Sequence, residues 1–271
     1  MTDAGIPALV ALIIQIILAL VVFQANPTRH ANQSFLFLSI AITGWLAAFF
    51  FGLRTNDPRI AELCIREASS VAALILLGLN FLRISIRERN RGWAELIRRS
   101  WIWVLIAVFV TLLCQTNLFL RGAHLPRVLG EAADPIYGPA FSLYVTMFVG
   151  AVLSLLIATL RDIRATTGSD RAELQFVLIA GILTVAASLP LTLVLGLVVP
   201  ASRLISLSPF RVIIFSLVVA YGISTQKIMD VGALLRRVIS YGLLTAYLLA
   251  LYALVWWLVA TVLHSSPQSH P

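Results

Sequence analysis

Eight long apolar runs occupy most of this chain of 271 residues, and they constrain its fold more than any other feature. A helix needs about 20 apolar residues to cross the hydrocarbon core of a bilayer. The runs cover residues 5–25, 34–53, 65–86, 101–120, 138–160, 172–198, 209–224 and 239–263. We therefore predict an all-α polytopic membrane bundle of about eight transmembrane helices, with little chain left for a soluble catalytic domain.

The composition agrees with a membrane protein and argues against a nucleic-acid partner. Hydrophobic residues make up 60% of the chain and charged residues 12%, whereas about a quarter of the residues in soluble domains are charged. The net charge of +8 comes almost entirely from arginines in short loops, because Lys227 is the only lysine. Membrane topology and anionic lipid headgroups explain such loop arginines. We expect the lipid bilayer and its headgroups, and no nucleic acid, as partners.

The distribution of cations between the loops predicts the orientation in the membrane. The first, third, fifth and seventh loops carry thirteen Lys and Arg residues, and the opposite side carries seven. The positive-inside rule places the richer set in the cytoplasm and both termini outside. The first apolar run has no basic leader and no small-residue cleavage site, which predicts an uncleaved membrane helix.

A charged link between the seventh and eighth runs is the expected route for a signal. It covers residues 225–238, and its apolar positions recur at spacings of three and four, which indicates an amphipathic segment at the headgroup level. The link divides the chain into a seven-helix bundle (1–224), the link itself, an eighth helix (239–263) and a polar tail (264–271). Two kinds of residue are expected to transmit a signal. Pro190 predicts a kink in the sixth helix, and the link contributes four charged residues: Lys227, Asp230, Arg236 and Arg237.

Polar residues in the outer halves of the predicted helices are the candidates for a ligand site. Polar groups are costly inside a membrane, so each has either a functional or a packing role. One interpretation is an outward-facing pocket in which an arginine binds an anionic or polar group. The other is solvated helix ends, with a snorkelling arginine. The candidates are Arg66, Glu67, Gln115, Asn117, Tyr137 and Arg211. For Asn80, Glu173 and Gln15 we expect either hydrogen bonds between helices or a solvated helix end.

Residue patterns argue against most catalytic and cofactor chemistry. The four histidines lie in loops or in the tail, and no lysine lies inside an apolar run, which excludes paired haem ligation in the bilayer and a retinal Schiff base. The sequence has no glycine-rich phosphate loop, zinc spacing or nucleophile elbow. Cys64 and Cys114 make no metal spacing, and either free thiols or a disulfide fits them. We expect no catalytic residue, no metal and no cofactor.

Three stretches resemble the seven-helix amino-terminal region of bacterial sensor histidine kinases. They are FLFLSIAITGWLAAFFFGL after Asn26-Pro27, IYGPAFSLYVTMFVGAVLSLLIATLRDIRATTGSDRAELQFVLIAG, and AYGISTQKIMDVGALLRRVISYGLLTA. Tyr137-Gly138-Pro139 and Arg236-Arg237 stand at positions that recur in that region. The resemblance implies a sensor module of a two-component system in the bacterial inner (cytoplasmic) membrane. Such a module detects a small molecule, a membrane state or a partner, and passes a conformational change to cytoplasmic domains.

Two other functions remain open from the sequence. Histidine kinases continue into phosphoacceptor and ATP-binding regions, whose motifs this sequence lacks, so kinase activity is not implied for this chain. A sensor would then act through a membrane-protein partner or a second copy. The first alternative is a non-enzymatic subunit of a larger membrane complex. The second is a small transporter, which would require broken helices at matching positions in two repeats, and only the sixth helix carries a proline break.

Overall fold

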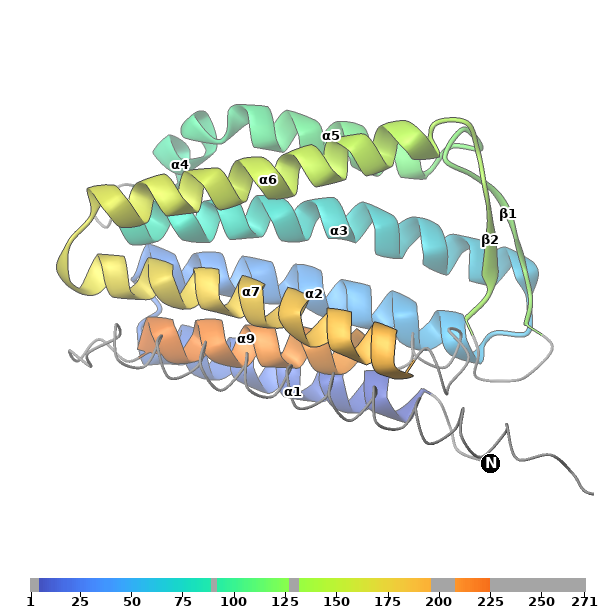
Figure 1. The fold of residues 1–271 in the computed structure, drawn as a ribbon, viewed down its shortest axis with the longest axis horizontal. Helices are drawn as coiled ribbons and strands as arrows, with labels where there is room; N and C mark the ends of the chain where they lie inside the picture. Colours follow the sequence, from blue (N-terminus) through green and yellow to red (C-terminus); the bar gives the residue numbers. More distant parts are fainter. Residues whose placement is uncertain (1–4, 89–91, 127–131, 196–207, 225–271) are drawn as a thin grey trace, which may run out of the picture.

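The computed structural model describes residues 5–88, 92–126, 132–195 and 208–224. Figure 1 shows an elongated bundle of helices that lie side by side, with a short pair of strands across one end. The link, the eighth apolar run and the tail lie outside the described residues, and so do Lys227, Asp230, Arg236 and Arg237. The elements are α1 (Ile6–Ala25), α2 (His30–Arg54), α3 (Pro58–Arg87), α4 (Trp93–Arg99), α5 (Trp101–Cys114), β1 (Leu120–His124), β2 (Asp134–Tyr137), α6 (Phe141–Ala165), α7 (Gly168–Leu195) and α9 (Ser208–Ser224).

Within the described residues, four helices are long and apolar enough to cross a membrane: α1, α2, α3 and α6. The helices α4 and α5 meet at an angle of 73°, and the described residues contain five spans if this bent pair is one span. Long apolar side chains on α1, α5 and α6 face outward, as hydrocarbon surroundings permit. The predicted class, a helical membrane bundle, is confirmed.

Two hydrophobic cores share α3. The first joins α1, α2, α7 and α9 to the last turns of α3 through Leu82 and Ile86. The second joins the rest of α3 to α4, α5 and the start of the hairpin, with Phe119 fully buried. Helix α6 has few buried residues, and all of them lie in its last two turns: Thr159, Asp162 and Ile163. Helix α6 is therefore buried most deeply in its last two turns.

Local chemistry explains where α3 begins. Pro58 occupies its first turn, where a missing backbone N–H costs nothing. The Asp57 carboxylate accepts a hydrogen bond from the Arg59 backbone N–H at 2.8 Å and caps the helix.

The connection between α5 and α6 differs from the sequence prediction in two ways. The predicted helix over 101–120 ends at Cys114, and the predicted loop contains the antiparallel strands β1 and β2, which pair from Leu120 with Tyr137 to His124 with Asp134. Gly138 fixes the end of the second strand, because a Cβ there would overlap the Leu118 carbonyl. Backbone that approaches this closely needs glycine.

Two further sequence predictions concern single residues. Helix α7 continues through Pro190 to Leu195, and the predicted kink stays a prediction. Cys64 and Cys114 are both buried free thiols.

Candidate functional site

The Arg66 guanidinium is the centre of a polar cluster at the hairpin end of the bundle. Its Nη2 donates to the Asn117 side-chain oxygen at 2.7 Å and to the Leu120 carbonyl at 2.9 Å, and its Nη1 donates to the Gln115 carbonyl. Glu62, one turn earlier on α3, forms an ion pair with it at 2.6 Å. Only 9% of Arg66 is exposed. Most of its donors therefore hold the segment that follows α5.

A second set of bonds ties the same segment to α3. The Gln115 amide donates to the Glu67 carboxylate and to the Ser70 hydroxyl, each at 3.1 Å. We call the whole group the Arg66 cluster: Glu62, Arg66, Glu67, Ser70, Gln115 and Asn117. Gln115 and Asn117 are exposed and Glu67 is half-buried, so a polar molecule outside the bundle can reach one side of the cluster.

Aromatic rings form a ledge beside the Arg66 cluster. The Tyr137 ring stacks on Phe141 with 3.6 Å between ring centroids, and Phe119 packs edge-on to Tyr144 at 5.0 Å. The Tyr144 hydroxyl donates to the Ser69 carbonyl on α3 at 3.4 Å. Burial raises the pKa of the Tyr137 hydroxyl, which therefore stays neutral at physiological pH. The ledge connects the hairpin to the first turns of α6.

The structure brings together four of the predicted site residues and places Tyr137 on the adjoining ledge. Arg211 does not join them: it lies on α9, which packs against α7, α1 and α2. No described hydrogen bond or ion pair links Arg211 to the Arg66 cluster, and its Nε is buried without a described partner. The packing order of the helices, which hydropathy does not encode, separates it from the rest.

At the opposite end of the bundle, a carboxylate on α6 binds two arginines on α3. Asp162 accepts from Arg83 and from Arg87, each at 2.6 Å. Arg83 also donates to the Asn80 side-chain oxygen at 2.9 Å, and the Asn80 amide donates to the Ser100 hydroxyl at 3.0 Å. Asp162 is 3% exposed. These bonds join α6, α3 and the α4–α5 junction.

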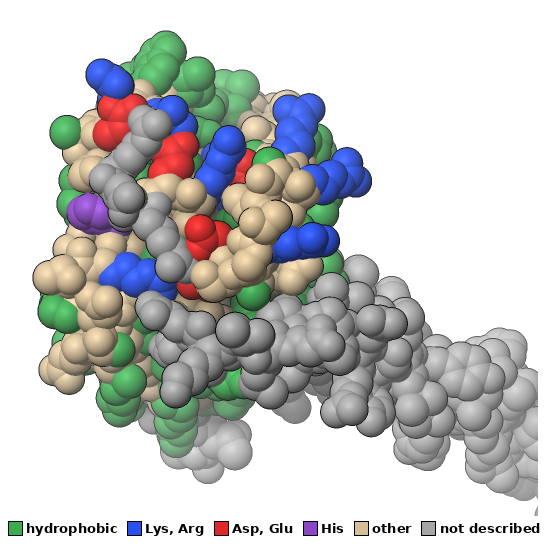
Figure 2. Space-filling view, turned by 90° about the vertical axis from the view of Figure 1, so that its left-hand side faces the viewer, with side chains coloured by type: hydrophobic (Ala, Val, Ile, Leu, Met, Phe, Trp, Pro, Cys, Tyr) green, Lys and Arg blue, Asp and Glu red, His purple; other side chains and the backbone are tan. Residues whose placement is uncertain are grey.

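A second ion pair at this end fastens α9. The Arg29 Nη2 contacts both Glu173 carboxylate oxygens, at 2.6 and 2.7 Å, and its Nη1 donates to the Ile223 carbonyl at 3.2 Å. The three residues belong to the α1–α2 turn, α7 and the last turn of α9. We call these bonds and those around Asp162 the basic-end network. Figure 2 shows this end of the molecule, where acidic side chains lie among basic ones.

Of the three polar residues expected to form hydrogen bonds between helices, two form them among the described residues and one does not. Asn80 and Glu173 do so, through the bonds described above. Gln15 does not: it is fully buried on α1, and neither polar atom of its amide has a described partner.

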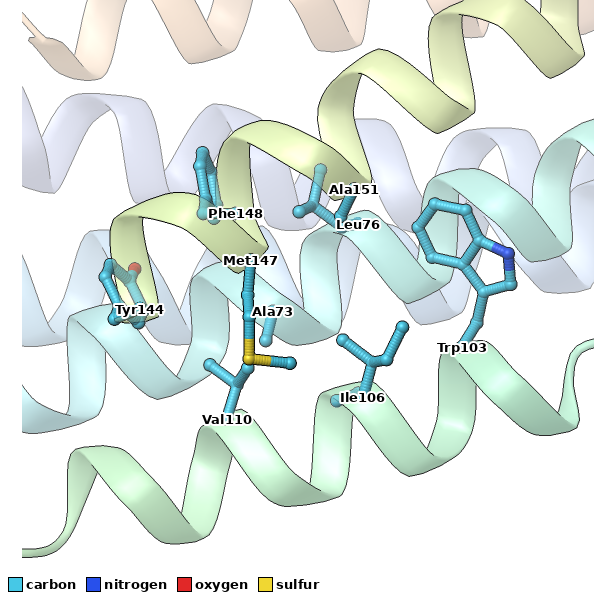
Figure 3. A pocket seen from close by; sticks show the side chains of 10 residues that line it. Ala73, Leu76, Trp103, Ile106, Val110, Tyr144, Met147, Phe148 and Ala151 are labelled. Carbon is cyan, nitrogen blue, oxygen red and sulfur yellow. The ribbon is translucent and has the colours of Figure 1, made fainter. Parts of the chain in front are cut away.

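An apolar void lies between α3, α5 and α6 (Figure 3). Its volume is about 20 Å³, and its lining includes Leu76, Ile106, Val110 and Met147. Pockets for small organic ligands measure about 300–1,000 Å³. The void is therefore too small to hold such a ligand, and the part of α6 beside it contains no buried residue.

The sequence interpretation missed Asp162, and it named Glu173 without identifying Arg29 as its partner. It used the arginines of this end only as evidence for orientation. The available signal was the position of two acidic residues, Asp162 and Glu173, beside arginine-rich turns predicted to lie at the same membrane face. Among the described residues, no group of three or more His, Cys, Asp or Glu side chains is arranged to hold a metal ion.

The family model for the N-terminal 7TM region of histidine kinase matches residues 7–232. This chain belongs to that family. The match includes every described helix and strand except the first residue of α1, and it confirms the resemblance seen in the sequence. No curated protein matches the chain. The family is defined on the membrane region of these kinases, so the 7TM bundle of this chain is of the sensor-region type and the match contributes no kinase domain.

Proposed function

We propose that this protein is a membrane sensor module that receives a stimulus at the hairpin end and passes a conformational change to the residues after α9. The observation that carries the proposal is the contact of the Arg29–Glu173 ion pair with the Ile223 carbonyl. Ile223 lies in the last turn of α9, directly before the 225–238 link. A movement of α7 relative to the α1–α2 turn must therefore strain or release the end of α9.

Close packing supports the same route. A Cβ at Gly222 would overlap the Phe176 side chain, so α9 and α7 approach each other more closely than any larger residue would allow. Glu173 lies one helical turn from Phe176 on α7. The ion pair and the glycine contact thus hold α9 to α7 at neighbouring positions, and the two helices are expected to move as one unit.

Helix α6 offers a path from the hairpin to the basic-end network. Its first turns belong to the aromatic ledge, and its last turns carry Asp162, bound by two arginines of α3. The void beside its middle leaves room for a small tilt. A ligand or partner that contacts Gln115, Asn117 or the hairpin would change that tilt, which Asp162 would pass to α3.

We further propose that the basic end faces the cytoplasm of a bacterial cell and that the receiver is a kinase domain, a membrane-protein partner or a second copy of this chain. The positive-inside rule supports this orientation, because the cation-rich loops belong to this end. Fusion of a periplasmic reporter at the α6–α7 turn tests it: the reporter is expected to be inactive there and active at the hairpin.

The functional test places the chain ahead of the catalytic region of a histidine kinase of the same family and measures autophosphorylation in membranes. Glu173→Gln removes the charge that holds Arg29 and is expected to change basal phosphorylation about fivefold or more, since coupling energies of this kind reach 1–3 kcal/mol. The matched control is Glu95→Gln, because Glu95 pairs with Arg98 on the surface of α4. Equal phosphorylation in both variants would contradict the proposed route.

A further inference from the structure

The described arginines at the basic end fall into two groups. One group pairs with carboxylates of the chain: Arg29, Arg83, Arg87, Arg98 and Arg99. The other group surrounds the α6–α7 turn and comprises Arg161, Arg164 and Arg171. These three side chains are exposed, and none forms a described hydrogen bond or ion pair. Figure 2 shows basic side chains that project at the rim of this face.

The backbone brings the three unpaired arginines close to one level. Helix α6 ends one residue after Arg164, and α7 begins three residues before Arg171. With a rise of 1.5 Å per residue, all three lie within about 6 Å of the end of the bundle. Arg161 and Arg164 are three residues apart and share one face of α6. Asp162 points away from that face, because it is buried and bound to α3.

The same face of α6 is apolar immediately above the arginines. Leu153, Ile157 and Leu160 are 51%, 47% and 37% exposed. Their spacing of four and three residues continues into Arg161 and Arg164, so one stripe of the helix changes from aliphatic to cationic at the end of the membrane span. An aliphatic stripe that ends in guanidinium groups matches an acyl chain below a phosphate headgroup.

We propose that Arg161, Arg164 and Arg171 bind the phosphate of an anionic phospholipid whose acyl chain packs along the exposed stripe of α6. Guanidinium groups bind phosphate oxygens through paired, charge-assisted hydrogen bonds. Among the described residues, no carboxylate forms an ion pair with these arginines, although Asp170 lies beside Arg171 in the first turn of α7. The site is separate from the ion pairs of the proposed signalling route, so either proposal can fail without the other.

The test uses the full chain in nanodiscs of mixed phosphatidylcholine and phosphatidylglycerol, with native mass spectrometry to measure the phosphatidylglycerol that the protein retains. Arg161→Gln with Arg164→Gln is expected to weaken retention about tenfold or more, because each basic residue near an anionic surface contributes appreciably to binding. The matched control is Arg59→Gln with Arg121→Gln, two exposed arginines at the hairpin end. It is expected to behave like the wild type.

Three outcomes would overturn the proposal. The first is unchanged retention in the α6 variant, and the second is an equal loss in the control. The third is complete displacement of phosphatidylglycerol by inorganic phosphate at an ionic strength matched with chloride, because that result identifies a site for free phosphate. Retention that withstands inorganic phosphate and falls only in the α6 variant supports a lipid site.

Discussion

Arg66 and Arg83 lie on the same helix, about 25 Å apart along its axis, and their partners differ in kind. Arg66 donates mainly to carbonyl and amide oxygens of the segment that follows α5. Arg83 binds a carboxylate on another helix, Asp162. The first arginine shapes a connection at the surface, whereas the second joins two membrane helices. One end of α3 therefore orders the segment that follows α5, and the other end fastens α3 to α6.

The largest effect is expected at the basic end. Asp162→Ala leaves two arginines of α3 without their carboxylate, and removal of one member of a buried ion pair costs about 3–5 kcal/mol. Unfolding of the purified protein in detergent, followed by circular dichroism, measures this loss. Asp134→Ala, at an exposed position of β2, is the control and is expected to change stability by less than about 0.5 kcal/mol. Similar losses of stability in the two variants would contradict a special role for the ion pairs of Asp162.

A smaller and local effect is expected at the hairpin end. Arg66→Met keeps the length of the side chain but removes its donors, which leaves the buried Leu120 carbonyl and the part-buried Gln115 carbonyl without them and costs about 1–3 kcal/mol. Hydrogen exchange is expected to rise in the segment from Gln115 to Tyr137 and to stay unchanged around Asp162. Arg66→Lys should give an intermediate result, because an ammonium carries its three donors on one nitrogen and does not reproduce the planar fork of five donors that a guanidinium presents. Faster exchange throughout the bundle would contradict a local role for Arg66.

The smallest loss of stability is expected when the cap of α3, at the same end of the bundle as the Arg66 cluster, is removed. Asp57→Ala removes the side-chain bond to the Arg59 backbone N–H, and loss of such a cap costs about 1 kcal/mol. Thermal unfolding should record that loss, while hydrogen exchange in the hairpin stays at the wild-type level. If exchange in the hairpin rises as much as in Arg66→Met, then capping and the Arg66 cluster cannot be separated.

The sequence predicted the helical membrane class because its signal is local: each apolar run is long enough to span a bilayer by itself. It also proposed Arg66, Glu67, Gln115 and Asn117 as one group, and the structure brings these four together, since an antiparallel pair of helices places the start of one run beside the end of the next. The strand pair was missed because two short strands are marginal alone and depend on tertiary contacts, here with α3.

Hydropathy does not predict ion pairs between residues that lie far apart in the sequence. Asp162 lies 79 residues from Arg83, and Glu173 lies 144 residues from Arg29. Their meeting depends on which helices are neighbours, and apolar runs of similar composition do not specify their order in a bundle. The same ambiguity led to the grouping of Arg211 with the Arg66 cluster, to which no described hydrogen bond or ion pair links it.

The proposed coupling between the Arg29–Glu173 ion pair and the end of α9 is tested most directly by a double-mutant cycle on these two residues. Hydrogen exchange in the last turn of α9 is the measured quantity. If the ion pair holds this turn, Arg29→Gln, Glu173→Gln and the double variant should each raise exchange at residues 220–224 to about the same extent, because removal of either partner removes the shared interaction. Unchanged exchange at residues 220–224, or effects that simply add in the double variant, would show that the ion pair does not couple α9 to the bundle.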